Sequence, residues 1–461
     1  MACWGMGNGR LLYVPVETKA REFLGKTFLA ARAAERGWTV ILGEANKIRD
    51  FMRDQPSGAY IEIGIPGKKA KRLEELYGLG YRIANMCEEG LVYSDGREYC
   101  NRKLGRRAIG FTDRLLVVGA RNADDIRANL PEFASKLAIT GNPRFDTLLS
   151  GPRCVYKRDA DALKAELGRF VIVNTNFTRA NPYGGVDYSS GPARIAALRR
   201  RGMVVTDDHL QYFLRFFYYQ QRQMRSLQEM LEKLASAGVV DRVVVRPHPV
   251  EDRNTWLEWA KSRKNLEVRW EGSAIEWMLA AEATLHPGCT TAIEGLMLDR
   301  PVFSYMPEQH AEFFNPADEV SEIVTSADDF IGRLLEIRDF NEGQIRSRFA
   351  SQRQRLAQLI ANVERPYAAD RILDELEQLE FPEREAKKVE EPRLGLLASL
   401  RRSFRKWRKP GDEERQARRR QKFPTLSKDE AEWAVGQWVE GGVLDRRVTI
   451  DSLSERILVF H

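Results

Sequence analysis

The segment LLYVPVETKAREFLGKTFLAARAAERGWTVILG, residues 11–43, decides the fold class. It begins with an apolar run over 11–16 and continues with an expected helix over 19–36, in which Leu24 and Phe28 lie on one face. A second buried run, WTVILG, follows directly. Strand, helix and strand in this order predict a parallel unit with a right-handed crossover.

The same alternation recurs along most of the chain. Further apolar runs, among them AYIEIG, RLLVVGA and KLAITG, extend the first series to about residue 150, and a linker over 150–161 precedes a second series. That series contains RFVIVNTNF, RVVVRPHP, LEVRW, ATLHPG and PVFSY. We predict an α/β protein with two Rossmann-like doubly wound domains facing a crevice, where ligands of such folds bind, plus a basic C-terminal extension. The expected boundaries are 1–155, 156–380, 381–425 for a charged linker with a basic amphipathic helix, and 426–461 for a small appendage.

Composition excludes several classes of protein. The 461 residues are 43% hydrophobic and 30% charged, which excludes fibrous and fully disordered chains. The five cysteines form no CxxC pair, so neither a disulfide framework nor a zinc site is indicated, and a reducing cytoplasm is expected. No apolar run reaches the length of a membrane span, and the first residues do not resemble a secretory signal.

The positive charge is concentrated in one segment. The net charge of the chain is +7, and residues 401–422 carry all of it, which argues against a nucleic-acid enzyme with a basic cleft. The sequence LLASLRRSFRKWRK has Leu, Phe and Trp at helical spacing among Arg and Lys. This pattern favours a helix at an anionic membrane surface, formed within 394–422, and a peripheral place on the inner face of the cytoplasmic membrane. A linker helix docked on its own domain and a nucleic-acid arm are the alternatives, although no nucleic-acid partner is expected. The candidate membrane-surface residues are Arg401, Arg402, Phe404, Arg405, Lys406 and Trp407.

Two motifs of the second series suit phosphate binding. In HPGCTTAIEG, Gly288 lets the backbone approach a ligand, Thr290 or Thr291 can cap the following helix, and Glu294 lies within reach of a ribose hydroxyl. The plain alternative is a capped helix with an ordinary first-turn acid. In RPHP, rigid backbone holds an arginine and a histidine that can contact phosphate, although a strand-end turn with a satisfied histidine is also possible. The nucleotide- or phosphate-binding candidates are Arg246, His248, Pro249, His286, Gly288, Cys289, Thr290, Thr291 and Glu294.

The first series supplies candidates for acid–base chemistry. Glu88 and Glu89 are adjacent, and like charges raise one another's pKa, which suits a general base; a surface pair of acids is the alternative. Other polar residues follow strands or begin helices, where side chains would face the crevice. These acceptor or crevice candidates are Lys19, Arg21, Glu22, Asn142, Arg144, Asn174 and Asn176.

Taken together, the motifs resemble a family. PVETKAREF, CEEGLVY, ITGNPRFDTL, VIVNTNF, VRPHPVED and HPGCTTAIEGLMLDRPVFSY, in this order over residues 11–310, resemble the bacterial surface carbohydrate biosynthesis proteins. That family is similar to two-domain GT-B glycosyltransferases that build capsule or lipopolysaccharide glycans. More distantly, bacterial sialyltransferases carry an acidic-acidic-Gly motif, a His-Pro motif and a hydroxyl pair, and Kdo transferases have similar His-Pro features. The resemblance implies that 1–155 binds the acceptor and 156–380 the nucleotide sugar.

The resemblance also implies an activity. A CMP-activated ulosonic acid, such as Kdo or a sialic-acid-like sugar, would be transferred to a glycan or glycolipid acceptor without metal or cofactor. Glu88 would be the general base, with Glu89 beside it, while His248 and the pair Thr290–Thr291 would hold the phosphate. The pair is Thr-Thr where the distant families have Ser-Ser, and Cys289 replaces a small polar residue. A CDP-glycerol-type polyol-phosphate transferase, a nucleotide-sugar 2-epimerase and a membrane-docked, non-catalytic assembly factor are the alternatives.

Overall fold

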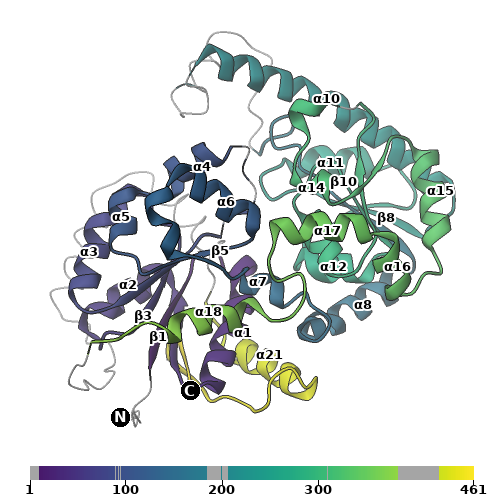
Figure 1. Ribbon diagram of the computed structural model, residues 1–461. Helices are drawn as coiled ribbons and strands as arrows, with labels where there is room; N and C mark the ends of the chain where they lie inside the picture. The colour runs from purple at the N-terminus through teal and green to yellow at the C-terminus, as the bar shows by residue number, and fades with distance from the viewer. Residues whose placement is uncertain are drawn as a thin grey trace, which may run out of the picture. The chain divides into compact units, whose positions relative to one another are not determined.

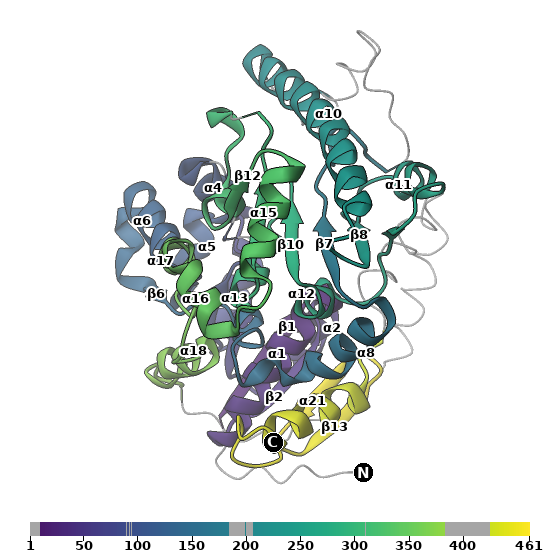
Figure 2. The same ribbon diagram turned by 90° about the vertical axis from the view of Figure 1, so that its right-hand side faces the viewer.

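The computed structural model forms two compact units. Unit 1 comprises Met1–Val155 and Ala357–His461, and unit 2 comprises Tyr156–Leu356. Each unit has a mainly or wholly parallel sheet with helices around it (Figure 1, Figure 2), which confirms the predicted α/β class with two Rossmann-like units. The structure describes residues 10–88, 90–91, 93, 95–183, 199, 206–308, 310–382 and 425–461.

The sheet of unit 1 has eight strands in the order β13-β14-β2-β1-β3-β4-β5-β6. From β2 to β6 all neighbours are parallel. All residues of β1 are buried, as expected for strands covered on both faces, and the predicted strand–helix–strand start of the chain is present as β1-α1-β2. The parallel strands are β1 (Leu11–Val16), β2 (Thr39–Glu44), β3 (Ala59–Glu62), β4 (Arg82–Met86), β5 (Arg114–Val117) and β6 (Leu137–Ile139).

Helices cover both faces of this sheet. On one face, Tyr13 and Tyr60 belong to an apolar core that includes residues of α2, α3, α5 and α6. On the other face, α1 packs against α7, α18 and α21. The helices are α1 (Lys19–Glu35), α2 (Ala45–Phe51), α3 (Ala70–Gly78), α4 (Gly96–Lys103), α5 (Arg106–Gly110), α6 (Ala120–Asn129), α7 (Pro143–Asp146), α18 (Ala368–Glu377) and α21 (Lys428–Glu440).

The C-terminal segment completes unit 1. The hairpin β13 (Ile450–Ser454) and β14 (Ile457–Phe460) adds antiparallel to β2 and covers its edge. The buried Asp146 carboxylate accepts the amides of Ala368 and Ala369, at 2.8 and 2.9 Å, at the start of α18. The boundaries expected at 380 and 426 therefore do not coincide with the compact units, because 357–382 and 425–461 pack on the first sheet.

The sheet of unit 2 has six parallel strands in the order β12-β11-β10-β7-β8-β9. Three adjacent strands, β10, β7 and β8, place their carboxyl ends side by side. The strands are β7 (Phe170–Asn174), β8 (Arg242–Arg246), β9 (Leu266–Val268), β10 (Ala283–His286), β11 (Val302–Tyr305) and β12 (Glu322–Val324). The helices are α8 (Lys157–Leu167), α10 (Asp207–Ser236), α11 (Arg253–Ala260), α12 (Ala274–Ala280), α13 (Thr291–Met297), α14 (Pro316–Glu319), α15 (Ala327–Ile337), α16 (Glu342–Arg348) and α17 (Ala350–Leu359), which ends beyond the unit boundary.

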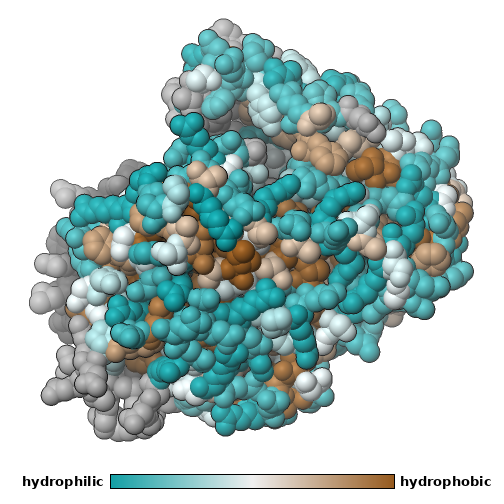
Figure 3. Space-filling model, viewed as in Figure 1, coloured by the Kyte–Doolittle hydropathy of each residue, from teal (hydrophilic) through white to brown (hydrophobic). Residues whose placement is uncertain are grey.

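The surface and the helices bear on the membrane expectation. The face drawn in Figure 3 is mainly hydrophilic, with apolar side chains in separate areas. Within the described ranges, no helix combines the length and apolarity needed to cross a bilayer. Glu89 and the candidate membrane-surface residues, Arg401, Arg402, Phe404, Arg405, Lys406 and Trp407, lie outside the described residues.

Candidate functional site

Three sequence motifs of unit 2 meet at one edge of its sheet. Asn176 follows β7, His248 follows β8, and Gly288 follows β10, and these three strands are neighbours in the order β10-β7-β8. The side-chain amide of Asn176 donates to the Gly288 carbonyl at 3.4 Å, joining the β7 and β10 loops. Ligands of doubly wound sheets bind at this carboxyl edge.

A buried carboxylate, Glu251, joins the β7 and β8 loops. It is 0% exposed, and its Oε1 accepts from the Thr175 hydroxyl (2.7 Å), the Phe177 amide (3.0 Å) and the His248 amide (3.3 Å). Its Oε2 accepts from Trp256 Nε1 at 2.9 Å. Burial raises the pKa of Glu251, and these hydrogen bonds oppose that rise. Sequence reasoning quoted this acid within VRPHPVED but assigned it no role, because two of its partners, Thr175 and Phe177, follow another strand.

His248 presents one ring N–H at this edge. Its side chain is half-buried, and its Nδ1 accepts the Val250 amide at 3.3 Å, which assigns the proton of the neutral ring to Nε2. Burial lowers the pKa of His248, so the ring is neutral near pH 7. Among the described residues, Nε2 has no hydrogen-bond partner. His248 therefore offers a neutral donor that suits an anionic oxygen.

Arg246 is engaged by the protein itself. Its two Nη groups donate to the carbonyls of Glu271 (2.7 Å) and Gly272 (2.6 Å), and its guanidinium lies over the Trp277 ring, 5.7 Å from the centroid. Burial lowers the pKa of Arg246. These contacts fix the loop between β9 and α12 and use one N–H of each Nη group.

His286 shapes the loop after β10. It is 0% exposed, its Nδ1 accepts the amides of Gly288 (3.1 Å) and Cys289 (3.2 Å), and its Nε2 lies 2.8 Å from the Ser321 hydroxyl. Burial lowers the pKa of His286 to about 3, so the ring is neutral. Gly288 has φ +79°, and a side chain there would meet Asn315 Nδ2 at 2.8 Å. Both ring nitrogens of His286 are thus occupied within the protein.

The threonine pair differs from the expected cap. Thr290 stands at the N-cap of α13 but has helical backbone angles, φ −65° and ψ −14°, and makes no side-chain cap. The prediction of a Thr cap is therefore wrong, because an N-cap side chain reaches the first-turn amides from an extended conformation. Thr290 is exposed, and the Thr291 hydroxyl donates to Cys289 Sγ at 3.3 Å. Burial raises the pKa of the Cys289 thiol to about 11.

Unit 1 holds a buried ionic cluster at its own sheet edge. The Lys26 ammonium donates to the Pro15 carbonyl (2.7 Å) and to Glu22 Oε2 (2.8 Å), and it lies 3.1 Å from Glu88 Oε1. Glu88 Oε2 accepts from the Asn142 side-chain amide at 2.9 Å. Glu22, Lys26, Glu88 and Asn142 are at most 7% exposed. The structure therefore brings together three predicted residues and one, Lys26, that sequence reasoning missed.

Charge pairing dominates this cluster. Burial lowers the pKa of Lys26, but the carboxylates of Glu88 and Glu22 outweigh it and raise the pKa overall. For Glu22, burial raises the pKa, whereas Lys26, the Glu17 amide and Arg21 together lower it. Glu22 and Lys26 are thus both charged near pH 7. The signal for Lys26 was its spacing of four residues from Glu22 in α1.

The remaining candidates of both units have other surroundings. Lys19 pairs with Glu430 of α21 at 2.6 Å, away from the cluster, and Arg21 contacts Glu22 at 3.1 Å. Asn142 Oδ1 caps α7 by accepting the Arg144 amide at 3.0 Å. Asn174 is buried at the end of β7.

Comparisons with known proteins address only the backbone. No protein-family model and no curated protein sequence matches this chain. The chain is similar to the MnaA–UDP co-structure of S. aureus (11% identity, 80% of this chain and 96% of that chain, TM-score 0.46). It is also similar to a UDP-N-acetylglucosamine 2-epimerase structure of Listeria monocytogenes (12%, 82% and 100%, TM-score 0.48) and to the wall teichoic acid polymerase TagF (9%, 80% and 88%, TM-score 0.48). We therefore assign site residues from contacts within this chain.

Proposed function

We propose that this chain is a GT-B-type, nucleotide-sugar-dependent glycosyltransferase of bacterial surface polysaccharide biosynthesis. One observation carries the proposal: the loops after β7, β8 and β10 are tied together by Glu251 and by the Asn176–Gly288 bond, and His248 leaves a neutral N–H there. Such an edge suits a nucleotide phosphate. The order of the sequence motifs supports the same class.

The donor is proposed to be a CMP-linked ulosonic acid, such as Kdo or a sialic-acid-like sugar. When the sugar departs, negative charge develops on the phosphate, and the Nε2–H of His248 would stabilise it without a metal. The His248 ring is neutral, and its orientation is fixed by the Val250 amide, so it can donate this hydrogen bond without a change in protonation. A glycan or glycolipid would be the acceptor, and residues 394–422 would hold the enzyme at an anionic membrane surface.

Glu88 is proposed to activate the acceptor hydroxyl. Asn142 and Lys26 orient its carboxylate, and an oriented carboxylate suits a general base. If configuration is retained, the same carboxylate would serve a double displacement. Glu88→Gln leaves the Lys26–Glu22 pair balanced in charge, so we expect loss of transfer with nucleotide binding retained.

Thermal melting with CMP, CDP, UMP, UDP and GDP tests the donor site. A ligand at 100 times its Kd adds about 2.7 kcal/mol of stability, which a melting curve detects. We expect a response to CMP that His248→Ala removes. His209→Ala, at an exposed position in α10, is the matched control and should keep the response.

Other outcomes would redirect the assignment. A preference for CDP favours the CDP-glycerol-type polyol-phosphate transferase, and a preference for UDP favours the nucleotide-sugar 2-epimerase. Absence of any response in folded protein would contradict a nucleotide donor and favour the membrane-docked assembly factor, in which Glu88→Ala has no effect.

A further inference from the structure

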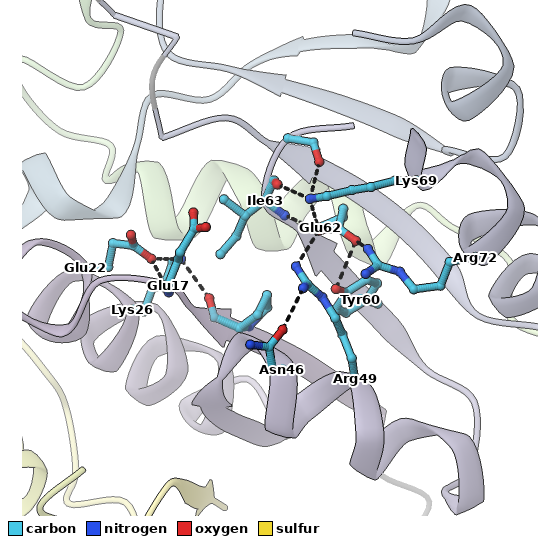
Figure 4. A network of polar contacts seen from close by, with 12 residues as sticks. Glu17, Glu22, Lys26, Asn46, Arg49, Tyr60, Glu62, Ile63, Lys69 and Arg72 are labelled. Atoms are coloured by element: carbon cyan, nitrogen blue, oxygen red, sulfur yellow. Dashed lines mark hydrogen bonds and ion pairs between the residues drawn. The ribbon is translucent and has the colours of Figure 1, made fainter. Parts of the chain in front are cut away.

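A second buried carboxylate in unit 1 is surrounded by cations. Glu62 is the last residue of β3 and is 0% exposed. Two of its donors are uncharged: the Tyr60 hydroxyl at 3.1 Å and the Ile63 amide at 3.0 Å. The other three are the cationic side chains of Arg49 (3.3 Å), Lys69 (2.8 Å) and Arg72 (Figure 4).

The cluster holds more positive charge than Glu62 neutralises. Within the described part of the chain, none of the three cations forms an ion pair with a second acid. An ionised carboxylate has about four lone-pair sites, so five donors saturate Glu62. Burial lowers the pKa of Lys69, and Arg49 and Arg72 add to this effect while Glu62 opposes it. Two cationic charges therefore remain without a counter-ion of their own.

The two guanidinium groups retain hydrogen-bonding capacity, whereas the ammonium group does not. Lys69 donates to the carbonyls of Ile63 (2.6 Å) and Gly64 (2.7 Å) as well as to Glu62, which uses its three donors. The Nε groups of Arg49 and Arg72 have no partner among the described residues. Both Nε atoms are buried, whereas the side chains as a whole are 23% and 30% exposed, so solvent reaches other atoms of each arginine.

The cluster lies where a doubly wound sheet binds its ligands. In this sheet β2 lies on one side of β1 and β3 lies on its other side. The direction of the strand order therefore reverses between β1 and β3, which makes this the switch point of the sheet. Glu62 ends β3 there, and the Glu22–Lys26 pair follows β1 (Figure 4). A side chain built at Gly64 would meet no atom of the described residues within 4 Å, so none of these residues fills the space beside the cluster.

We infer that Arg49 and Arg72 form an oxyanion subsite at the switch point of unit 1, and that the acceptor carries a carboxylate or phosphate group there. Guanidinium groups suit both oxyanions because their N–H donors match paired oxygens. A neutral glycan would leave the excess charge unmatched. The acceptor assignment rests on the proposed function, whereas oxyanion binding does not.

Calorimetric titration of the full chain at constant ionic strength tests the subsite. The probes are inorganic phosphate, glucuronate and glucose, and the stronger of the first two identifies the preferred oxyanion. We expect binding of at least one anion and none of glucose. The Arg49→Gln/Arg72→Gln variant should bind that anion at least about tenfold more weakly. Arg107→Gln, which removes an exposed arginine paired with Glu74 in the same unit, should bind as the wild type does.

Two further variants keep the test decisive. Arg72→Gln alone removes the more exposed guanidinium if the double variant does not fold, and it should also weaken binding. The melting response to CMP should persist in Arg72→Gln, which separates this subsite from the nucleotide site at His248. Absent binding, equal binding by the arginine variants and the wild type, or equal weakening in Arg107→Gln would overturn the inference. Anion binding without any nucleotide response would instead remove the proposed function and leave the subsite standing.

Discussion

The two units hold the carboxylates buried at their sheet edges in different ways. In unit 1, Glu62 and Glu88 face cationic side chains, and Lys26 bridges Glu88 to Glu22. In unit 2, Glu251 faces a hydroxyl, two backbone amides and an indole N–H, all uncharged.

The difference has an electrostatic consequence. Cations lower the pKa of Glu22 below its usual value despite burial, whereas neutral donors leave the pKa of Glu251 raised. Unit 1 therefore places charged groups at the carboxyl ends of its strands. Unit 2 fixes the loops there with neutral hydrogen bonds and presents the neutral His248 side chain. Variants that remove one ion-pair partner in unit 1 or one hydrogen-bond partner in unit 2 should show which arrangement contributes more to stability.

The largest effect is expected from Lys26→Met. This change leaves Glu88 buried without its cation and leaves Glu22 with only the partly exposed Arg21. Breaking a buried ion pair lowers the free energy of unfolding by about 3–5 kcal/mol. Urea denaturation measures the loss. Lys19→Met is the control: Lys19 lies on α1, as Lys26 does, but its ion pair with Glu430 of α21 is more exposed. Its loss should change stability by at most about 1 kcal/mol. Equal losses in the two variants would refute the role of Lys26.

A smaller effect is expected from Glu251→Gln. One carboxylate oxygen becomes an NH₂ group, which faces a donor such as Trp256 Nε1, so stability should fall by about 1–3 kcal/mol. Because the His248 amide loses part of its anchor, the melting response to CMP should weaken too. Glu258→Gln, an exposed acid of α11, is the control and should change neither. An unchanged CMP response would mean that Glu251 does not support nucleotide binding at the carboxyl ends of β7, β8 and β10.

The smallest effect is a pH slope from His286. Its folded pKa is about 3, so between that pH and about 6.5 the unfolded chain binds a proton that the folded chain does not. Stability contributed by the neutral ring is therefore lost as pH falls, by about 1.4 kcal/mol per pH unit. Urea denaturation at pH 5 and 6 should show this slope in the wild type, and His286→Asn should lack that part. An identical slope in both would mean that the buried ring accepts a proton.

Local sequence pattern predicted the parallel strands well. The start β1-α1-β2 follows from apolar runs flanking a helical pattern, and parallel strands that share an edge place Asn176, His248 and Gly288 together. The hairpin of β13 and β14 was not recognised as part of the first sheet. Short edge strands carry no local information about their partner, and Arg456 contacts Glu44 across 412 positions of sequence.

The partners of polar side chains were the less predictable part of the site. The Glu271 and Gly272 carbonyls that hold Arg246 come from a loop whose position only the folded chain defines. Lys26 was missed because lysine in an amphipathic helix usually indicates the solvent face. Glu62 was interpreted only as a strand residue. Its three cationic partners lie on separate helices and turns before and after it, and the sequence does not show that they meet.

The pairing of β14 with β2 also sets an order of events during protein synthesis. The strand β2 leaves the ribosome early, but its outer edge receives β14 only after all of unit 2 has been translated. Unit 2 is continuous in sequence and can fold as soon as it has emerged. Until the β13–β14 hairpin has been made, the unpaired edge of β2 can form hydrogen bonds with strands of other chains, which exposes the nascent chain to aggregation.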